Sequence, residues 1–220
     1  MKIDIITLFP NMFKGPFDES IVKRAQGKKL VEINIHDLRE YGFGERRTVD
    51  GRPYGGGVGM ILMVEPIFKA LEKIKTKNSK VILLTPRGKT FNQKNAVKLS
   101  KIDHLIFIAG HYEGYDERIT DFVDEEISIG NFVLTGGEIP TMAIVDSIVR
   151  LIPGVLIKED ATKYESFSEK NEVEYPQYTR PEEFEGLKVP KVLLSGNHKK
   201  ISDWREKESK EKTRKINSED

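Results

Sequence analysis

The stretch LIFIAGHYEGYDERITDFVDEEISIGNFVLTGGEIP, from Leu105 to Pro140, decides how this chain folds. Its first residues, Leu105 to Ala109, form an apolar run of the length and β-branched content that is typical of a buried strand. The run stops at Gly110, and histidine, tyrosine and acidic residues follow at once. A second apolar run, Phe132 to Leu134, ends in the same way, in Thr-Gly-Gly-Glu. Because open α/β sheets build sites beyond the carboxyl ends of their strands, we expect a functional site here.

Strands and helices alternate on both sides of this stretch. A strand at 3–9, a helix at 13–27 and a strand at 30–36 favour a right-handed parallel crossover. The sequence therefore predicts an α/β fold with an open, mostly parallel sheet. Apolar patterning also predicts a strand at 80–84, helices at 64–74, 92–99 and 141–150, and a helical or irregular piece at 116–126.

Composition favours an ordinary globular protein that works in the cytoplasm. The 220 residues are 38% hydrophobic and 32% charged, which is enough to bury a core. No apolar run approaches the roughly 20 residues of a membrane span, and the N-terminus does not resemble a signal peptide. The chain contains 0 cysteines, which excludes disulfides, thiolate metal sites and thiol nucleophiles.

A change in character after Leu156 predicts a second, smaller domain. The segment that follows is polar and short of large aliphatic residues, as interdomain linkers are. We therefore expect one domain at 1–157, a linker at 158–172 and a second domain at 173–220. Within the second domain, 189–194 is predicted as a short strand or turn, and a basic helix that carries Trp204 follows.

That helix is locally basic although the net charge of the chain is only +1. Between Lys199 and Lys215 there are eight basic residues against four acidic ones. Such a segment is typical of a surface that binds a polyanion. It is equally typical of a solvated helix face with ion pairs between residues four apart.

The segment 41–60 has many glycines and no periodicity, which is typical of a functional loop. Three interpretations are open: a loop that closes over a ligand, a phosphate cradle, or a simple connection. The run Gly55-Gly56-Gly57-Val58-Gly59 meets neither nucleotide-binding fingerprint, because no Gly-Lys-Ser/Thr follows and no strand leads directly into it.

Six stretches, in order, resemble the signatures of one family. They are Phe9-Pro10 with Met12-Phe13, DGRPYGGG at 50–57, GHYEGYDER at 110–118, SIGNFVLTGGE at 128–138, Arg150 with PGVL at 153–156, and YTRP at 178–181. The chain resembles the bacterial tRNA (guanine-37-N1)-methyltransferases of the knotted methyltransferase superfamily, from about residue 1 to residue 205.

The resemblance implies S-adenosylmethionine as methyl donor, held in a deep trefoil knot within domain 1–157. It also implies an obligate homodimer with active sites shared between subunits, and a small, mainly helical tRNA-binding domain at 173–220. The residues implied in cofactor binding are Leu84, Thr85, Pro86, Gly110, Tyr112, Glu113, Gly114, Ile129, Gly130, Asn131, Phe132, Val133, Leu134, Gly136, Gly137 and Pro140.

The family's catalytic residues fall on Glu165 and Arg150 by position. Guanine N1 must lose its proton as the methyl group arrives, and a carboxylate can accept it. Negative charge then builds on O6, where an arginine stabilises the transition state. Glu165 stands where the family has an aspartate, so the carboxylate of the base sits one methylene further out. Asp160, in the same linker, is the alternative base.

Magnesium is implied beside Glu113, with Glu165 as the second protein ligand. Mg²⁺ prefers oxygen ligands and keeps several waters, so two carboxylates can suffice. The alternative is that Glu113 is a carboxylate at a helix N-terminus or a partner of Arg118. His111 stands where many family members carry arginine and some carry histidine.

Contacts with the anticodon stem-loop are implied for both domains. Single-stranded loops are bound through splayed bases and phosphate contacts. Charges of a surface loop remain the alternative for Asp50 and Arg52, and Trp204 is more typical of a packing anchor than of a base-stacking platform. The residues implied are Asp50, Arg52, Glu174, Tyr178, Arg180, His198, Lys199 and Arg205.

Three hypotheses about function follow. The first is methylation of guanine 37 in tRNA. The second is another RNA methyltransferase of the same superfamily, which acts on ribosomal RNA or at a different tRNA position. The third is an RNA-binding module without catalysis, for which the replacement of aspartate by Glu165 and Glu174 is the only argument.

Overall fold

A computed structural model describes the chain apart from residues 158–161, 163–164, 169–171 and 219–220. The chain divides into two compact units, Met1–Ile157 (unit 1) and Lys158–Asp220 (unit 2). Each unit is described by itself.

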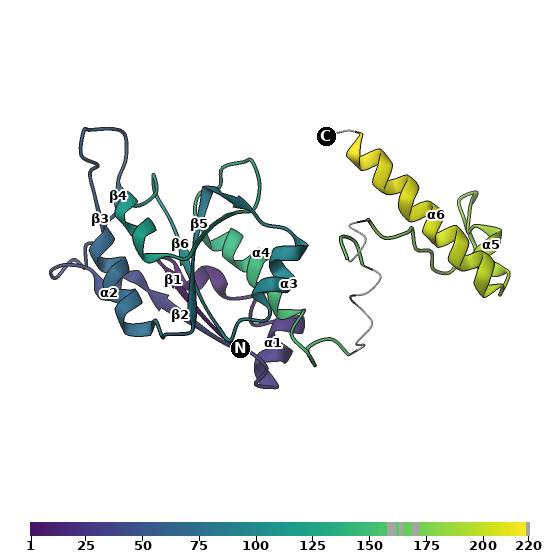
Figure 1. The fold of residues 1–220 in the computed structure, drawn as a ribbon, viewed down its shortest axis with the longest axis horizontal. Coiled ribbons are helices and arrows are strands. Elements are labelled where there is room, and N and C mark those ends of the chain that lie inside the picture. The colour runs from purple at the N-terminus through teal and green to yellow at the C-terminus, as the bar shows by residue number, and fades with distance from the viewer. Residues whose placement is uncertain (158–161, 163–164, 169–171, 219–220) are drawn as a thin grey trace. The chain divides into compact units, whose positions relative to one another are not determined.

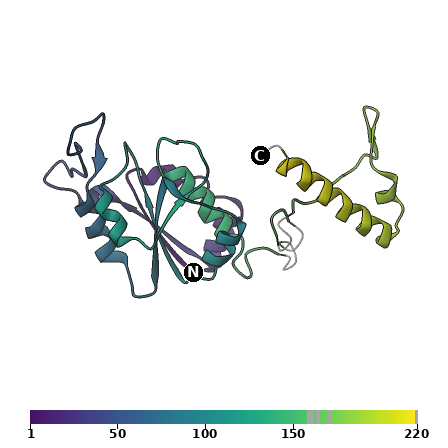
Figure 2. The same cartoon turned by 45° about the horizontal axis from the view of Figure 1, so that its top comes forward.

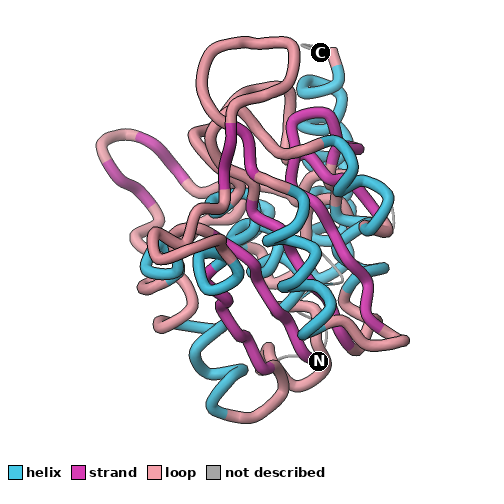
Figure 3. The backbone as a smooth tube through the Cα atoms, turned by 90° about the vertical axis from the view of Figure 1, so that its left-hand side faces the viewer, coloured by secondary structure: helices cyan, strands magenta, loops and turns pink. Residues whose placement is uncertain are grey.

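Unit 1 is built on a five-stranded sheet in the order β2-β1-β6-β5-β7. Every pairing between neighbouring strands of this sheet is parallel, so the predicted α/β fold with a parallel sheet is confirmed. Figure 3 shows the strands side by side. Their bounds are β1 Lys2–Thr7, β2 Glu32–Asp37, β5 Ser79–Thr90, β6 His104–Ala109 and β7 Glu125–Ser128.

Helices cover both faces of this sheet (Figures 1 and 2). Helices α1, α3 and α4 pack on one face and α2 packs on the other. Because helices cover both faces of the sheet, the side chains on both faces of each inner strand are buried. The inner strands are therefore nearly continuous apolar runs. The helix bounds are α1 Ser20–Gly27, α2 Val64–Ile74, α3 Gln93–Leu99 and α4 Glu138–Val149.

The pleat of the strands divides the core into two layers. In β6, Leu105 and Phe107 pack with α1, α3 and α4, whereas Ile106 and Ile108 pack with α2. Successive residues of a strand point to opposite faces of the sheet. Because helices cover both faces, all four side chains are buried. The apolar run that opens the deciding stretch is therefore the centre of unit 1.

The predicted helix at 13–27 is too long. The structure has a 3₁₀ helix, Pro10–Phe13, and α1 begins only at Ser20. Between them Gly15 adopts a φ of +92°, and a proline follows it, so the backbone cannot continue as a helix. Phe13 and Phe17 are nevertheless buried, with ring centroids 5.6 Å apart, which explains why their spacing suggested a helix.

Two predictions at the carboxyl edge of the sheet are wrong. Strand β5 does not end at Leu84: it continues to Thr90, with a break in its register against β7 between Leu84 and Lys89. The apolar run Phe132–Leu134 is not a strand, since its side chains are exposed in a loop. The strand in this region is β7, whose first two residues are glutamates at the end of the piece at 116–126 that was predicted as helical or irregular.

The loop predicted at 41–60 contains a short antiparallel ribbon. β3, Asp50–Gly51, pairs with β4, Ile61–Leu62, while the residues between them extend as an exposed loop (Figure 1). A 3₁₀ helix, Leu38–Tyr41, precedes this segment. The ribbon closes the base of the loop and fixes its two ends side by side.

Helices are the largest elements of unit 2 among its described residues. Its long helix is α6, His198–Asn217, and the segment before it packs along that helix: Ser209 Oγ donates to Val173 O at 2.6 Å. Residues 189–194 were predicted as a strand or turn, but they contain the helix α5, Lys191–Leu194. A two-stranded hairpin, β8 Glu183–Phe184 and β9 Leu187–Lys188, was not predicted.

A buried ionic cluster lies where the parallel strands begin. The carboxylate of Asp4 in β1 is fully buried and accepts hydrogen bonds from His36 Nε2 at 2.8 Å and His104 Nε2 at 2.5 Å. Lys2 Nζ lies 3.0 Å from it. Burial alone would raise the pKa of Asp4, but the bonds from His36, Lys2 and His104 outweigh it and hold the pKa well below its ordinary value.

We expect Asp4→Asn to lower the free energy of unfolding by about 2–4 kcal/mol at pH 7, because the buried charge-assisted bonds are lost. A carboxyl whose folded-state pKa is depressed stabilises the fold above its unfolded pKa and loses that effect as the pH falls towards the folded value. The difference in unfolding free energy between the wild type and the variant should therefore become smaller below about pH 4. Urea unfolding of both proteins across pH measures it.

The exposed neighbour of His104 supplies the control, since Asp103→Asn removes the same charge without a buried site. A deficit of Asp4→Asn that matches this control, or that does not change with pH, would contradict the prediction.

None of the helices in the described part of the chain combines the length and the apolar character that a membrane crossing requires.

Candidate functional site

A cavity of about 540 Å³ opens at the carboxyl edge of the sheet in unit 1. Four segments form most of it: the irregular middle of β5, the loop after β6, the end of β7 with the loop that follows it, and the start of α4. Its size lies within the usual range of small-molecule sites, roughly 300–1,000 Å³. The expectation that polar residues after neighbouring parallel strands would meet is therefore met in the structure.

Most of the residues that the sequence implied in cofactor binding lie together here. Fifteen of the sixteen line the cavity, and the exception, Asn131, has an exposed side chain in the same loop. The fifteen are Leu84, Thr85, Pro86, Gly110, Tyr112, Glu113, Gly114, Ile129, Gly130, Phe132, Val133, Leu134, Gly136, Gly137 and Pro140.

Gly137 lets two backbone segments of the cavity wall lie close together. Gly137 N donates to Gly110 O at 2.7 Å, and a Cβ atom on Gly137 would lie 2.8 Å from both Ala109 Cα and Gly110 N. Backbone atoms cannot move aside as the end of a side chain can, so only glycine fits at this position. The start of α4 is thereby held directly against the exit of β6.

Behind this wall lies a buried polar pair. Glu138 is 1% exposed, and its Oε1 accepts a hydrogen bond from Thr7 Oγ1 at 2.8 Å. Its Oε2 and His111 Nδ1 are 3.6 Å apart, and both are buried without a hydrogen-bond partner in the described structure. A Cβ on Gly136 would lie 2.4 Å from each of these two atoms. His111 thus lines the cavity and lies next to the buried carboxylate of Glu138.

Several lining residues are not among those that the sequence implied in cofactor binding. Arg87 Nη2 contacts Glu117 Oε2 at 2.8 Å, and the Arg87 guanidinium lies 5.9 Å from the Tyr115 ring centroid. Burial is the main cause that raises the pKa of Tyr115 above its ordinary value, so the phenol stays neutral. Only their place next to strand exits, which many surface residues share, could have identified them. The complete set of additional lining residues is Arg87, His111, Tyr115, Glu117, Ile127, Ser128 and Thr135.

Glu113 lines the cavity, and Arg118 pairs with a different carboxylate. Arg118 Nη2 contacts Asp116 Oδ2 at 2.7 Å, and Arg118 Nε contacts Asp116 Oδ1 at 2.8 Å. The hydrogen bond from the Arg118 side chain is the main cause that lowers the pKa of Asp116. The alternative in which Glu113 pairs with Arg118 is therefore not supported by the geometry.

Arg150 lies at the opposite end of α4 from the cavity. The helix begins at the cavity wall and runs for 12 residues before Arg150 caps its C-terminus. At 1.5 Å per residue this is about 18 Å. Beyond Arg150, Gly154 O accepts a hydrogen bond from Lys28 Nζ at 3.3 Å, and Lys28 lies just before the start of β2. The lining of the cavity described here does not include Arg150.

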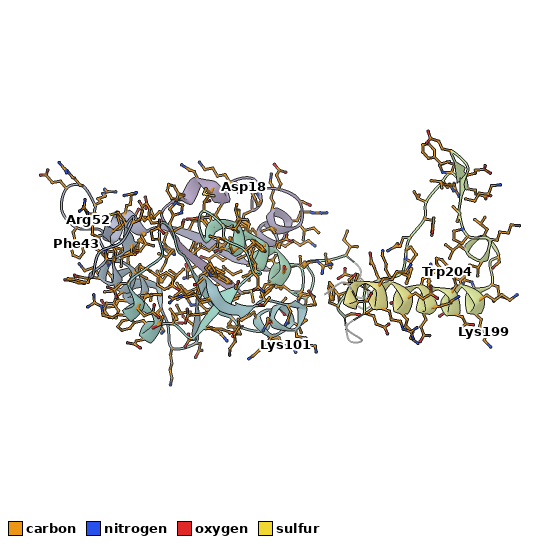
Figure 4. The ribbon with its side chains drawn as sticks, turned by 90° about the horizontal axis from the view of Figure 1, so that it is seen from above. Asp18, Phe43, Arg52, Lys101, Lys199 and Trp204 are labelled. Atoms are coloured by element: carbon orange, nitrogen blue, oxygen red, sulfur yellow. The ribbon has the colours of Figure 1, made fainter. Side chains whose placement is uncertain are left out.

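The other implied residues lie at surfaces of the two units. In Figure 4, Arg52 stands on the loop of unit 1 and Lys199 at the start of α6 in unit 2. Asp50 is half-buried in β3. Tyr178 is half-exposed, 6.4 Å from Trp204 between ring centroids, so Trp204 packs against this segment. The exposed implied residues of unit 2 are Glu174, Tyr178, Arg180, His198, Lys199 and Arg205.

Glu165 lies in a turn of unit 2, where Ser168 N donates to Glu165 O at 3.3 Å. The reserve base Asp160 lies outside the described residues. Within the described ranges, no group of three or more His, Asp or Glu side chains gathers in the way that a metal-binding cluster would.

The fold and the cavity define an α/β protein of the class that holds a ligand at the carboxyl edge of a parallel sheet. Comparison with known proteins narrows this class. A family model described as tRNA (guanine-1)-methyltransferase TrmD matches residues 1–219.

Individual relatives agree with that match. The chain is 58% identical over 213 residues to a tRNA (guanine-N(1)-)-methyltransferase of Dictyoglomus turgidum, which covers 97% of this chain and 86% of the relative. It is 53% identical over 217 residues to the Bacillus subtilis protein of that name, with 97% and 89% covered. The chain therefore belongs to the tRNA (guanine-1)-methyltransferase family, an enzyme family, and the resemblance inferred from its motifs is confirmed.

Proposed function

We propose that this enzyme transfers a methyl group from S-adenosylmethionine to N1 of guanine 37 in the anticodon loop of tRNA. The observation that carries the proposal is the cavity of unit 1, in which fifteen residues implied in donor binding converge. Membership of the tRNA (guanine-1)-methyltransferase family supports both the reaction and the RNA substrate.

The cavity suits a methyl donor that carries a neutral base and no phosphates. Its glycines leave room for a ligand to lie close to the backbone, and its apolar side chains can pack on an adenine ring. The glycine run in the loop is then not needed as a phosphate cradle. When bound, S-adenosylmethionine supplies an electrophilic methyl group attached to a sulfonium sulfur.

The protein side of the reaction is the handling of one proton and one developing charge. Glu165 accepts the proton that leaves guanine N1, and Arg150 stabilises the negative charge that builds on O6. Glu113 and Glu165 are the proposed protein ligands of Mg²⁺, whose preference for oxygen they satisfy. Glu113 is the only one of these three residues in the lining described for the cavity.

A homodimer explains the place of Arg150. Because Arg150 caps the end of α4 far from its own cavity, we infer that each active site takes this arginine from the other subunit. Exposed apolar side chains beside the cavity support such a contact: Val133 is 84% exposed and Ile139 47% exposed. Apolar surface of this kind is typical of a face that a partner covers.

The proposed enzyme also has a knotted chain, binds RNA and works in the cytoplasm. The deep trefoil knot implied by the family resemblance is part of the proposal. The exposed basic residues of unit 2 support binding of an anticodon stem-loop, together with Asp50 and Arg52 of unit 1. An enzyme that uses tRNA and contains 0 cysteines is expected in the cytoplasm.

Transfer of a labelled methyl group to tRNA transcripts tests the proposal. A transcript with guanine at positions 36 and 37 should be labelled at residue 37, and a transcript with adenine at 37 should not. Mapping the label elsewhere would favour a different RNA target within the superfamily. A lack of label with dimeric protein, the donor and magnesium present would contradict the proposed function.

The close approach at Gly137 predicts the effect of one methyl group on donor binding. Gly137→Ala would press a Cβ against the backbone of Ala109 and Gly110. We expect the unfolding free energy to fall by about 1–3 kcal/mol. Donor affinity should fall by about 10- to 100-fold as the cavity wall is displaced. Calorimetric titration of donor measures this.

The matched control is Gly27→Ala at the end of α1, where an added Cβ meets nothing within 4 Å. It should bind the donor like the wild type. An unchanged affinity in Gly137→Ala would show that the donor does not depend on this wall.

A further inference from the structure

The exposed loop of unit 1 is physically connected to the residue beside the cavity that is the proposed magnesium ligand. β4 pairs with β3 on one side, with Asp50 opposite Leu62. On its other side Leu62 N donates to Gly114 O at 2.9 Å, and Asp116 N donates to Leu62 O at 2.8 Å. Glu113 N also donates to Met60 O at 3.1 Å. A hydrogen-bonded strip therefore runs from Asp50 through β4 to the loop that carries Glu113.

At the end of this loop Gly59 lies against the Glu113 side chain. A Cβ atom on Gly59 would come within 2.5 Å of Glu113 Cγ and 2.9 Å of Glu113 Oε1. Real Cβ contacts do not occur at 2.5 Å, so any larger residue at 59 would force the Glu113 side chain out of its place. The glycine also has a φ of +82°, which side chains disfavour.

From this contact, and resting on the role of Glu113 in the proposed function, we infer that Gly59 is a positioning residue for methyl transfer. It leaves Glu113 the space for the conformation in which its carboxylate faces the cavity. Because this loop carries Arg52 and follows directly on Asp50 in β3, the contact links the proposed RNA-binding residues of unit 1 to the proposed metal ligand. The glycine acts through Glu113 and touches no reacting atom.

The loop itself offers a control for backbone strain. Gly56 has a φ of +83°, almost the same as Gly59, but a Cβ added to it meets nothing within 4 Å. Gly56→Ala therefore measures the cost of placing alanine in this backbone conformation in the same loop. The difference between Gly59→Ala and Gly56→Ala isolates the collision with Glu113.

Single-turnover methyl transfer at saturating tRNA and donor tests the inference, with donor affinity measured in parallel. We expect Gly59→Ala to lower the rate by about tenfold or more and Gly56→Ala by less than about threefold. In a Glu113→Gln background, Gly59→Ala should add less than about a twofold further loss, because the residue through which it acts is already inactive. Ordinary structural damage would instead multiply with the loss from Glu113→Gln.

Stability provides a second measurement if Gly59→Ala unfolds easily. Glu113→Ala removes the Cγ atom that collides, so adding Gly59→Ala to it should cost no more stability than Gly56→Ala does. Equal rates for Gly59→Ala and Gly56→Ala, or losses that multiply in the double variants, would overturn the inference. A wild-type protein that fails to methylate tRNA would instead count against the proposed function.

Discussion

Arg150→Ala is expected to slow methyl transfer by about 100- to 1,000-fold, because the negative charge on guanine O6 would lose its stabilising guanidinium. Donor affinity should change little, since Arg150 lies at the far end of α4 from its own cavity. Single-turnover rates and donor titrations measure the two effects. Arg24→Ala, an exposed arginine on α1, is the control for loss of a positive charge, and should keep wild-type activity.

Mixed dimers then test which subunit supplies the arginine. Arg150→Ala has an intact cavity, and Glu113→Gln has an intact arginine, so a dimer of one of each contains one complete site if the site is shared. Random exchange of the two inactive proteins should restore about a quarter of the wild-type rate, since half of the dimers are mixed and each has one working site. No recovery after verified subunit exchange would mean that Arg150 serves its own subunit.

Glu165→Gln is expected to lower the rate by about 100- to 10,000-fold, because glutamine cannot take the proton from guanine N1. Glu165→Asp keeps a carboxylate and restores the residue type implied by the family, so its loss should be far smaller. Both variants should bind tRNA, which a filter-binding assay verifies. The rates of the three proteins at saturating substrates carry the comparison.

The exposed Glu72 on α2 offers the same charge change away from the site, and Glu72→Gln should have the wild-type rate. If Glu165→Gln retains that rate as well, Glu165 is not the base, and Asp160 becomes the residue to replace.

The interior of unit 1 could be predicted closely from sequence because burial and sequence pattern have one cause. The predicted helix at 64–74 has the bounds of α2, and the predicted strands at 80–84 and 105–109 lie within β5 and β6. The apolar residues of α2 face one core, so their spacing reports the helical period, whereas the two strands are buried on both faces and appear as continuous apolar runs.

The outermost strand of the sheet, β7, could not be predicted in this way. β7 pairs only with β5, and its charges are balanced locally, as where Lys80 Nζ contacts Glu125 Oε2 at 2.6 Å. Its sequence is therefore too polar to indicate a strand. The apolar run Phe132–Leu134 was instead wrongly predicted as a strand, because its side chains are exposed beside the cavity rather than buried in the sheet.

The candidate site was predictable where it depends on chain order and not where it depends on distant contacts. Glycines directly after β6 and before α4 indicated where the backbone turns at the carboxyl edge. The contact of Gly59 with Glu113 joins residues far apart in the chain, and no local pattern reports it. The burial of Glu138 behind His111 is a packing result of the same kind.

The two ends of α4 have a consequence for how the enzyme responds to its own abundance. Under the proposed sharing of active sites, a lone subunit would have the cavity at one end of the helix and, at the other, the arginine that only the partner's cavity uses. It could hold the donor without turning it over. At concentrations below the dissociation constant of the pair, mass action would make output rise with the square of the amount of protein.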